Sequence, residues 1–302
     1  MEISAPKEWF GLLEALGEAK GIALLLGATD TGKSTLARFL ISHLCRRGFK
    51  VGLVDADIGQ SFLGPPATIG FSLFKSDPDW ELVLSQPEIF FVGSVTPEGH
   101  FPIHLQGVKK MVDRASSSGV EITVVDTTGF ILGEAGMELK RRKIDLISPQ
   151  FIVALQRDAE IEPLLKIYQD YPLCKIYRLP LSEQIRSRSM EERKAYRTNR
   201  FRDYFRSSVT RELAIEEIRI EGEVRDADGA ILPLDWSLRI TGLLIGLKDG
   251  NDNTLALGTV RNYFEEKKVL RVFTPLREIE GVRALQLSSL RPMLVYEEDQ
   301  RA

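Results

Sequence analysis

Short runs of apolar residues, each closed by a glycine or a polar residue, recur through the first half of the chain. The first is residues 22–26 (IALLL), which Gly27 ends. Runs of the same kind follow at 50–54, 89–93, 122–125 and 152–155. Runs this short and this apolar are typical of strands that are buried on both faces of a parallel sheet. We therefore expect these segments to be strands of one mostly parallel sheet.

A different spacing separates the first two runs. Apolar side chains recur there every three or four residues, at Leu36, Phe39, Leu40 and Leu44. This is the period of a helix with one buried face, and it predicts a helix from Lys33 to about Arg47. Strands that alternate with helices indicate an α/β fold, in which helices cover both faces of the sheet.

Polar segments follow four of the predicted strands. They are GATDTGKS, DADIGQ, GSVTPEG and DTTGF, in chain order. The carboxyl ends of parallel strands lie at one edge of a sheet, and α/β proteins bind their ligands there. The sequence therefore predicts one site to which these segments contribute.

The pattern changes from about Glu212. Ile218, Ile220 and Val224 alternate with charged residues, and 249–252 (DGND) is typical of a hairpin turn. We expect an α/β domain at 1–210 and a small β-rich C-terminal domain at 211–302. The first domain would include a basic segment at about 184–206.

Composition adds few constraints. The chain has 302 residues, a formal net charge of −3 and 43% hydrophobic residues, which is ordinary for a globular protein of two domains. The two cysteines and three histidines show no metal-binding or redox spacing. No apolar run approaches the length of a membrane span, and the N-terminus lacks a signal-peptide core. We expect a cytoplasmic protein without a membrane partner.

The first polar segment is a phosphate-binding loop by its spacing. It fits G-x-x-x-x-G-K-[ST] and lies between a predicted strand and a predicted helix. Its backbone N–H groups would face the phosphates, the Lys33 ammonium would neutralise their charge, and the Ser34 hydroxyl would bind Mg²⁺. The residues expected to bind nucleotide are Gly27, Ala28, Thr29, Asp30, Thr31, Gly32, Lys33, Ser34 and Thr35.

Carboxylates follow two of the other strands. Asp55 and Asp57 end the second strand, where one of them could accept the proton of an attacking hydroxyl group. Asp126 ends the strand at 122–125, where P-loop proteins place an acidic group for Mg²⁺. We expect Ser34, Asp126 and Asp55 to form the metal site.

The segment Arg186–Arg206 contains eight Lys or Arg residues and three Asp or Glu residues. Arginines placed over a triphosphate stabilise the charge of the transferring phosphoryl group. A solvated helix face is the alternative interpretation of this segment. We interpret a second basic run, KRRK at Lys140–Lys143, as a solvated helix end.

No Asn-Lys-x-Asp motif for guanine occurs in the chain, and Leu155-Gln156-Arg157-Asp158 lacks the Asn-Lys pair. ATP, or loose base selectivity, is therefore expected.

Six segments together resemble a known family: GATDTGKST, VDADIGQ, FFVGSVTPEGH, VVDTTGFILG, KIDLISPQFIVALQ and RSRSMEERKAYRTNRFRDYF. They are similar to the polynucleotide 5′-hydroxyl kinases of RNA processing, which include the kinase subunit of eukaryotic pre-mRNA cleavage factor and its ribosomal-RNA-processing relative. The resemblance spans Gly27 to Phe205. It implies transfer of the γ-phosphate of ATP, with Mg²⁺, to the 5′-hydroxyl end of RNA or DNA.

The resemblance also implies roles for individual residues. Asp57 resembles the general base, and Arg188 and Arg193 resemble the lid arginines that clamp the phosphates beside Lys33. Phe130 stands where eukaryotic members often have Trp, and Asp126 where they often have Asn. The residues expected to contact the nucleic acid are Gln60, Thr96, Phe130, Arg197 and Arg200.

Two other functions share these motifs. One is an ATPase that acts as a nucleotide-dependent switch or assembly factor, because Asp-x-Asp after the second strand also occurs in such proteins. The other is a small-molecule kinase with the same P-loop core.

Overall fold

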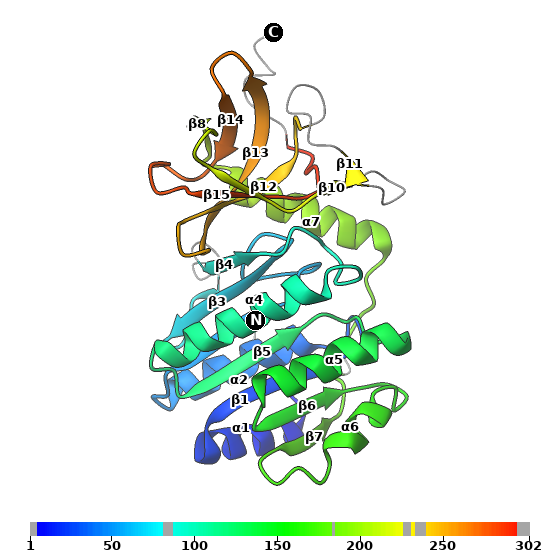
Figure 1. Ribbon diagram of the computed structural model, residues 1–302. Coiled ribbons are helices and arrows are strands. Elements are labelled where there is room, and N and C mark those ends of the chain that lie inside the picture. The colour runs from blue at the N-terminus through cyan, green and yellow to red at the C-terminus, as the bar shows by residue number, and fades with distance from the viewer. Residues whose placement is uncertain (1–4, 81–86, 183–184, 226–230, 233–239, 295–302) are drawn as a thin grey trace. The chain divides into compact units, whose positions relative to one another are not determined.

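The computed structural model of the chain describes residues 5–80, 87–182, 185–225, 231–232 and 240–294 (Figure 1). The chain forms two compact units. The first unit consists of Met1–Gly64, Ile69–Glu88 and Thr96–Ser189, and the second of Pro65–Thr68, Ile89–Val95 and Met190–Ala302. Residue 184, at which the expected basic segment begins, lies outside the described residues.

The first unit is built on a mostly parallel sheet with the strand order β7-β6-β1-β5-β2-β3. Only β3 is antiparallel to its neighbour β2 among these described pairs. The strands are β1 (Gly21–Gly27), β2 (Val51–Ala56), β3 (Thr68–Phe74), β5 (Ile122–Thr127), β6 (Phe151–Leu155) and β7 (Lys175–Leu179). The central strands are buried on both faces, as their apolar runs predict. The α/β fold expected from the sequence is therefore confirmed.

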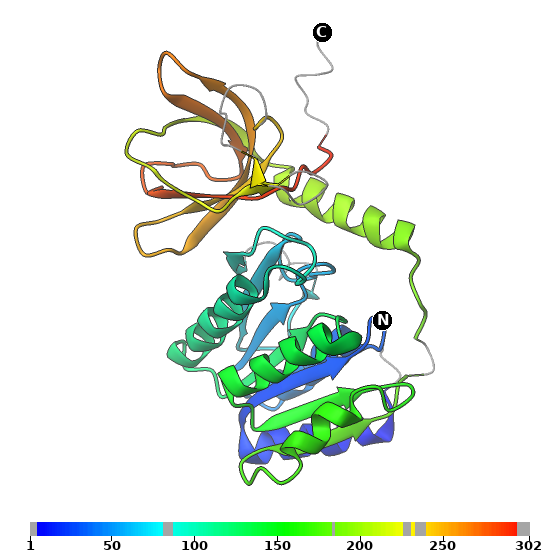
Figure 2. The ribbon, with the colours of Figure 1, turned by 45° about the vertical axis from the view of Figure 1, so that its right-hand side comes forward.

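Helices cover both faces of this sheet (Figures 1 and 2). The helices α1 (Lys7–Ala19) and α2 (Lys33–Arg46) lie on one face, and α4 (Phe101–Ser117) and α5 (Gly133–Ile147) on the other. The short α6 (Glu162–Tyr168) follows β6. Of these, α1 was not predicted, although its apolar residues have helical spacing and pack in the core: Trp9, Leu12, Leu13 and Leu16. None of the helices in the described part of the chain is long and apolar enough to cross a membrane.

The second unit is a mostly antiparallel sheet, which confirms the β-rich C-terminal region. The strand order is β4-β13-β12-β15-β9, and β14 pairs with both β13 and β8. Its strands are β4 (Glu88–Phe91), β8 (Val209–Ala214), β9 (Arg219–Glu221), β12 (Leu244–Lys248), β13 (Thr254–Phe264), β14 (Val269–Thr274) and β15 (Ala284–Leu287), with a small separate hairpin of β10 (Val224–Arg225) and β11 (Ile231–Leu232). The turn predicted at 249–252 joins β12 to β13.

The strand predicted at 89–93 differs from expectation in its pairing. It forms β4, and Ile89 pairs antiparallel with Thr254 of β13. The strand is present as predicted, but its described pairing is antiparallel, where a parallel one was expected. The apolar run alone could not distinguish these cases, because both kinds of strand are buried.

One helix, α7 (Met190–Phe205), belongs to the second unit. Phe201 and Phe205 pack in a cluster with Leu244 and Leu257. The Tyr204 hydroxyl also accepts a hydrogen bond of 2.8 Å from the backbone N–H of Leu257. The expected division at 210/211 placed this helix with the α/β domain, whereas the compact units divide at 189/190.

Candidate functional site

The phosphate-binding loop lies between β1 and α2, as its sequence predicts. Gly32 begins the helix in the left-handed conformation, with φ of 87°, which glycine adopts at little cost. The Lys33 Nζ donates hydrogen bonds to the carbonyl oxygens of Gly27 (3.0 Å) and Ala28 (2.7 Å). Burial lowers the pKa of Lys33. The nearby carboxylates of Asp126, Asp57 and Asp30 oppose this shift, but they do not cancel it.

The loop meets the end of β5 at the two residues expected to bind Mg²⁺. The Ser34 hydroxyl donates a hydrogen bond of 2.5 Å to Oδ2 of Asp126. Asp126 Oδ1 is buried and has no hydrogen-bond partner among the described residues. Burial raises the pKa of Asp126, while Lys33 and the Ser34 hydrogen bond lower it. A carboxylate oxygen left in this state is suited to accept from a water molecule or to bind a cation.

A glycine lets the segment after β5 approach the phosphate-binding loop. A side chain at Gly129 would bring its Cβ within 2.4 Å of the Thr29 backbone nitrogen. Real Cβ atoms do not come so close to backbone atoms. The Asp-Thr-Thr-Gly segment therefore needs glycine at its fourth position for close contact with the P-loop.

The two carboxylates after β2 differ in their surroundings. Asp55 is fully buried, and its Oδ2 accepts from the Ser61 hydroxyl (2.9 Å) and the backbone N–H groups of Phe62 (2.8 Å) and Leu63 (3.0 Å). Its Oδ1 accepts from the backbone N–H of Asp57 at 3.1 Å. Burial and the neighbouring Asp126 carboxylate raise the pKa of Asp55, while the backbone hydrogen bonds lower it. Asp55 therefore stabilises the conformation of the loop that follows β2.

Asp57, in contrast, is only half-buried. Its Oδ1 accepts from the backbone N–H groups of Gly59 (3.1 Å) and Gln60 (3.0 Å), which fixes the direction of the carboxylate. It is close enough to Lys33 to raise the pKa of that lysine. Of the two carboxylates, Asp57 is the one available to a substrate.

The predicted lid arginine Arg188 contacts the phosphate-binding loop directly. Its backbone N–H donates to Asp30 Oδ2 (2.9 Å), and its Nε donates to Oδ1 of the same carboxylate (3.2 Å). The Asp30 side chain is 4% exposed and that of Arg188 is 39% exposed. The other lid candidates, Arg193, Arg197 and Arg200, lie on α7 in the second unit, so their approach to the phosphates stays a prediction.

Sequence reasoning missed Arg157, which contacts the same loop from the end of β6. Its guanidinium donates to the carbonyl oxygens of Asp30 (2.7 Å) and Thr29 (3.4 Å). β6 is the neighbour of β1 in the sheet, so the residue after β6 comes beside the loop that follows β1. The sequence gives no local signal for this contact, because it depends on the order of the strands in the sheet.

The interpretation of KRRK as a solvated helix end is wrong for two of its four residues. Arg141 and Arg142 are exposed and pair with Glu138. Lys140 and Lys143 have no exposed surface. The run lies within α5, and Lys140 and Lys143, three residues apart, share its buried face.

The expected nucleic-acid contacts in the first unit are Gln60, Thr96 and Phe130. Gln60 lies in the loop of Asp57 and is partly exposed, and Thr96 is exposed. Phe130 packs edge-to-face against Phe101 of α4, with ring centroids 6.1 Å apart. Gln60 belongs to the loop of Asp57, and Phe130 follows Asp126 by four residues. The contact of all three side chains with nucleic acid stays a prediction.

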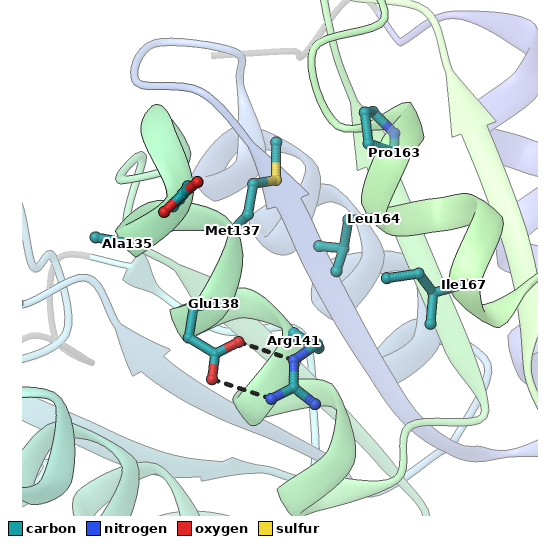
Figure 3. A pocket seen from close by; sticks show the side chains of 8 residues that line it. Ala135, Met137, Glu138, Arg141, Pro163, Leu164 and Ile167 are labelled. Atoms are coloured by element: carbon teal, nitrogen blue, oxygen red, sulfur yellow. Dashed lines mark hydrogen bonds and ion pairs between the residues drawn. The ribbon is translucent and has the colours of Figure 1, made fainter.

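A surface pocket of about 600 Å³ lies between α5 and α6 (Figure 3). Met137, Leu164 and Ile167 form its apolar part, and Arg141 donates two hydrogen bonds to Glu138 at its polar side. None of the predicted site residues lines it. The candidate site is therefore the open edge of the sheet and not this pocket.

Comparison with known proteins identifies the family to which the chain belongs. The sequence model of the family described as "mRNA cleavage and polyadenylation factor CLP1 P-loop" matches residues 27–207 of the chain. The chain belongs to this family. The matched CLP1 P-loop region begins at the first glycine of the phosphate-binding loop and ends just after α7.

Archaeal relatives of this CLP1 P-loop protein align over most of its length. A polyribonucleotide 5′-hydroxyl-kinase of Pyrococcus abyssi is 29% identical, and the alignment covers 89% of this chain and 86% of the relative. One of Methanocaldococcus jannaschii is also 29% identical with the same coverage. The polyribonucleotide 5′-hydroxyl-kinase Clp1 of Xenopus tropicalis is 28% identical over 64% of this chain and 45% of its own length.

A solved structure shows the same fold. The Clp1p chain of a Clp1p–Pcf11p complex superposes with a TM-score of 0.77 at 15% identity, and covers 96% of this chain and 80% of that one. The CLP1 P-loop region therefore occurs here in the architecture already seen for a family member.

Proposed function

We propose that the protein is an ATP- and Mg²⁺-dependent polynucleotide kinase that phosphorylates the 5′-hydroxyl end of RNA or DNA. One observation carries the proposal. A complete P-loop with its Ser34–Asp126 pair lies beside an available carboxylate, Asp57, in a chain whose relatives are named polyribonucleotide 5′-hydroxyl-kinases.

Asp57 is the base in this mechanism. Its carboxylate accepts the proton of the 5′-hydroxyl as the oxygen forms its bond to the γ-phosphorus and the bond to the β–γ bridging oxygen breaks. The backbone N–H groups of Gly59 and Gln60 hold that carboxylate in one orientation. The products are ADP and a 5′-phosphorylated end, and the proton leaves Asp57 for solvent.

Two cationic side chains stabilise charge on the transferring group. The Lys33 ammonium, which contacts the loop carbonyls at Gly27 and Ala28, would reach the β- and γ-phosphates from the same position. Arg188, which contacts Asp30 on the same loop, would bind the triphosphate from there. Arg193 on α7 would complete the clamp.

The residues fit a magnesium ion. The Ser34 hydroxyl and the Asp126 carboxylate meet at 2.5 Å, and Asp126 Oδ1 has no hydrogen-bond partner in the described part of the chain. No cluster of three or more His, Cys, Asp or Glu side chains suited to a metal occurs there either. Mg²⁺ in kinases is bound through one or two protein groups, phosphate oxygens and water, so a small ligand set is expected. When bound, the ion would neutralise phosphate charge. Asp55, whose oxygens already accept four hydrogen bonds, is the weaker ligand candidate.

The nucleic-acid end would lie over the loops that carry Gln60, Thr96 and Phe130. The Phe130 and Phe101 rings, in contact with one another, offer a face for a terminal base. Arg197 and Arg200 on α7 would bind backbone phosphates.

The test is transfer of labelled γ-phosphate from ATP to oligonucleotides. A 5′-hydroxyl oligoribonucleotide and its DNA counterpart are offered with Mg²⁺, and matched oligonucleotides with a 5′-phosphate serve as controls. Label on the 5′-hydroxyl oligonucleotides alone supports the proposal. Hydrolysis of ATP without transfer would favour a nucleotide-dependent switch, and transfer only to small molecules would favour a small-molecule kinase.

A further inference from the structure

Two buried lysines on α5 have no place in the mechanism above. Lys140 and Lys143 are three residues apart, and both have no exposed surface. Burying an ammonium group costs much free energy unless other charges or hydrogen bonds compensate it. The compensating groups of both lysines belong to the phosphotransfer site.

Lys140 contacts the segment that follows Asp126. Its Nζ donates to the Thr127 hydroxyl (3.0 Å), the Thr128 carbonyl oxygen (2.5 Å) and the Thr128 hydroxyl (3.2 Å). The Thr127 hydroxyl in turn donates to the Leu25 carbonyl oxygen of β1 at 2.7 Å. Lys140 thus ties the residues after Asp126 to the strand that precedes the P-loop.

Lys143 is compensated by charge at longer range. Its Nζ has no hydrogen-bond partner among the described residues. Burial lowers the pKa of Lys143 to about 7, and the Asp57 and Asp126 carboxylates oppose that shift, whereas Lys33 adds to it. The same buried region contains His104 of α4, whose Nε2 lies 3.2 Å from the Ala56 carbonyl oxygen.

The region brings ionisable groups of both signs together, and burial lowers the pKa of Lys140 well below its usual value. Three carboxylates end β2 and β5 or follow them directly: Asp55, Asp57 and Asp126. Three buried lysines lie near two of these carboxylates: Asp57 and Asp126 oppose the lowering of the pKa by burial at Lys33, Lys140 and Lys143. Lys33 is the one lysine of the three that lies on the nucleotide-binding loop. Lys140 and Lys143 lie on α5, away from that loop in the chain.

We propose that Lys140 and Lys143 are positioning residues for phosphoryl transfer. Lys140 holds the segment after Asp126 through its hydrogen bonds to Thr127 and Thr128, and Lys143 lies fully buried one turn away on the same face of α5, with no hydrogen-bond partner for its Nζ among the described residues. The inference rests on the proposed function for its kinetic part, and its structural part can be measured without substrate. Both lysines are fully buried, so both would act through the residues they pack against.

The test compares Lys140→Met and Lys143→Met with Arg141→Met and Arg142→Met in the full chain. The arginines lie in the same run of α5 but are exposed, so they are matched controls for loss of a positive charge from this helix. For each variant, kcat and KM for ATP are measured with a 5′-hydroxyl oligonucleotide. Thermal midpoints and amide hydrogen exchange of the peptide that covers 126–129 are measured without ligand.

Both lysine variants should lose about 10–100-fold in kcat with KM for ATP changed less than about threefold, as for other residues that orient a site. Lys140→Met should speed exchange at 126–129. Lys143→Met should keep or raise the thermal midpoint, because it removes a buried charge without a hydrogen bond. The arginine variants should match the wild type in kcat and in exchange.

Three results would overturn the inference. The first is full turnover in both lysine variants, and the second is a loss of turnover that only follows a smaller folded fraction. The third is unchanged exchange at 126–129 in Lys140→Met. If the wild-type protein labels no oligonucleotide, the proposed function fails, and the exchange and thermal measurements still decide whether the lysines position the site.

Discussion

The Ser34 hydroxyl of the P-loop donates a 2.5 Å hydrogen bond to Asp126 at the end of β5. These residues are 92 positions apart in the chain. They meet because β1 and β5 are adjacent parallel strands, so the loops after them lie at the same edge of the sheet. The pair makes the metal site the most direct part of the proposal to test.

Asp126→Asn keeps the shape of the side chain but removes its charge. We expect the Mg²⁺ concentration for half-maximal transfer to rise about 10–100-fold, because a neutral oxygen binds the cation less well. A magnesium titration of the initial transfer rate measures this. Asp113→Asn, at an exposed carboxylate on α4 that pairs with Lys109, is the control. An unchanged titration in Asp126→Asn would remove this residue from the metal site.

Lys33→Ala should lower transfer by about 100-fold or more, because the ammonium stabilises charge on the transferring phosphoryl group. The protein should remain folded, since the ammonium donates its hydrogen bonds to two carbonyl oxygens of its own loop. Single-turnover transfer and circular dichroism measure the two effects. Wild-type turnover in this variant would contradict the whole P-loop mechanism.

Asp57→Asn and Asp55→Asn should separate catalysis from stability. Asp57→Asn should reduce transfer by roughly 10²–10⁴-fold while nucleotide still binds, because the amide cannot act as a base. Asp55→Asn should lower the free energy of unfolding by about 1–3 kcal/mol, because a buried N–H or O–H donor loses its acceptor. Urea unfolding and transfer rates on both variants provide the comparison. If Asp55→Asn is stable but inactive and Asp57→Asn is active, the two roles are reversed.

Arg188→Ala should lower kcat by roughly 10³-fold, the lower end of the effect of an arginine on a transferring phosphoryl group. Its ion pair with Asp30 is partly exposed, so the free energy of unfolding should change by less than about 1 kcal/mol. Arg178→Ala is a matched control, because that exposed arginine pairs with Glu162. A variant that loses only oligonucleotide affinity would place Arg188 in a binding surface and not in a catalytic lid.

Lys143 predicts a pH dependence of stability. Burial lowers its pKa from 10.5 to about 7 in the folded chain, so the unfolded chain binds the extra proton between these values. Stability therefore rises with pH between about 7 and about 10, by up to about 1.4 kcal/mol per pH unit from this group, and levels off below pH 7, where both states hold the proton. Urea unfolding without Mg²⁺ at pH 6–9 should show a smaller slope for Lys143→Met than for the wild type. Equal slopes would contradict the lowered pKa.

The local parts of the candidate site could be predicted from sequence. The phosphate-binding loop is one continuous segment, and its conformation depends on its own glycines and on the strand and helix beside it. The helix from Lys33 and the central strands followed from hydrophobic spacing, with ends within two residues of those observed. The first helix, Lys7–Ala19, has the same kind of spacing at Trp9, Leu12, Leu13 and Leu16 but was missed.

Other parts depended on which segments meet in space. Asp55 and Asp57 are indistinguishable by residue type, and only the folded loop gives the first of them four hydrogen-bond donors. Arg157 reaches the P-loop because β6 lies next to β1, and nothing local to its sequence indicates that order.

The KRRK run at Lys140–Lys143 shows most directly which properties follow from sequence and which follow from tertiary structure. The sequence by itself determined that four positive charges lie together, and it determined the P-loop chemistry because both depend on neighbours in the chain. Only the tertiary structure decided that Arg141 and Arg142 face solvent while Lys140 and Lys143 are buried beside the site. The reason is that burial depends on how α5 is turned toward the sheet, and that rotation is fixed by packing against segments distant in the chain.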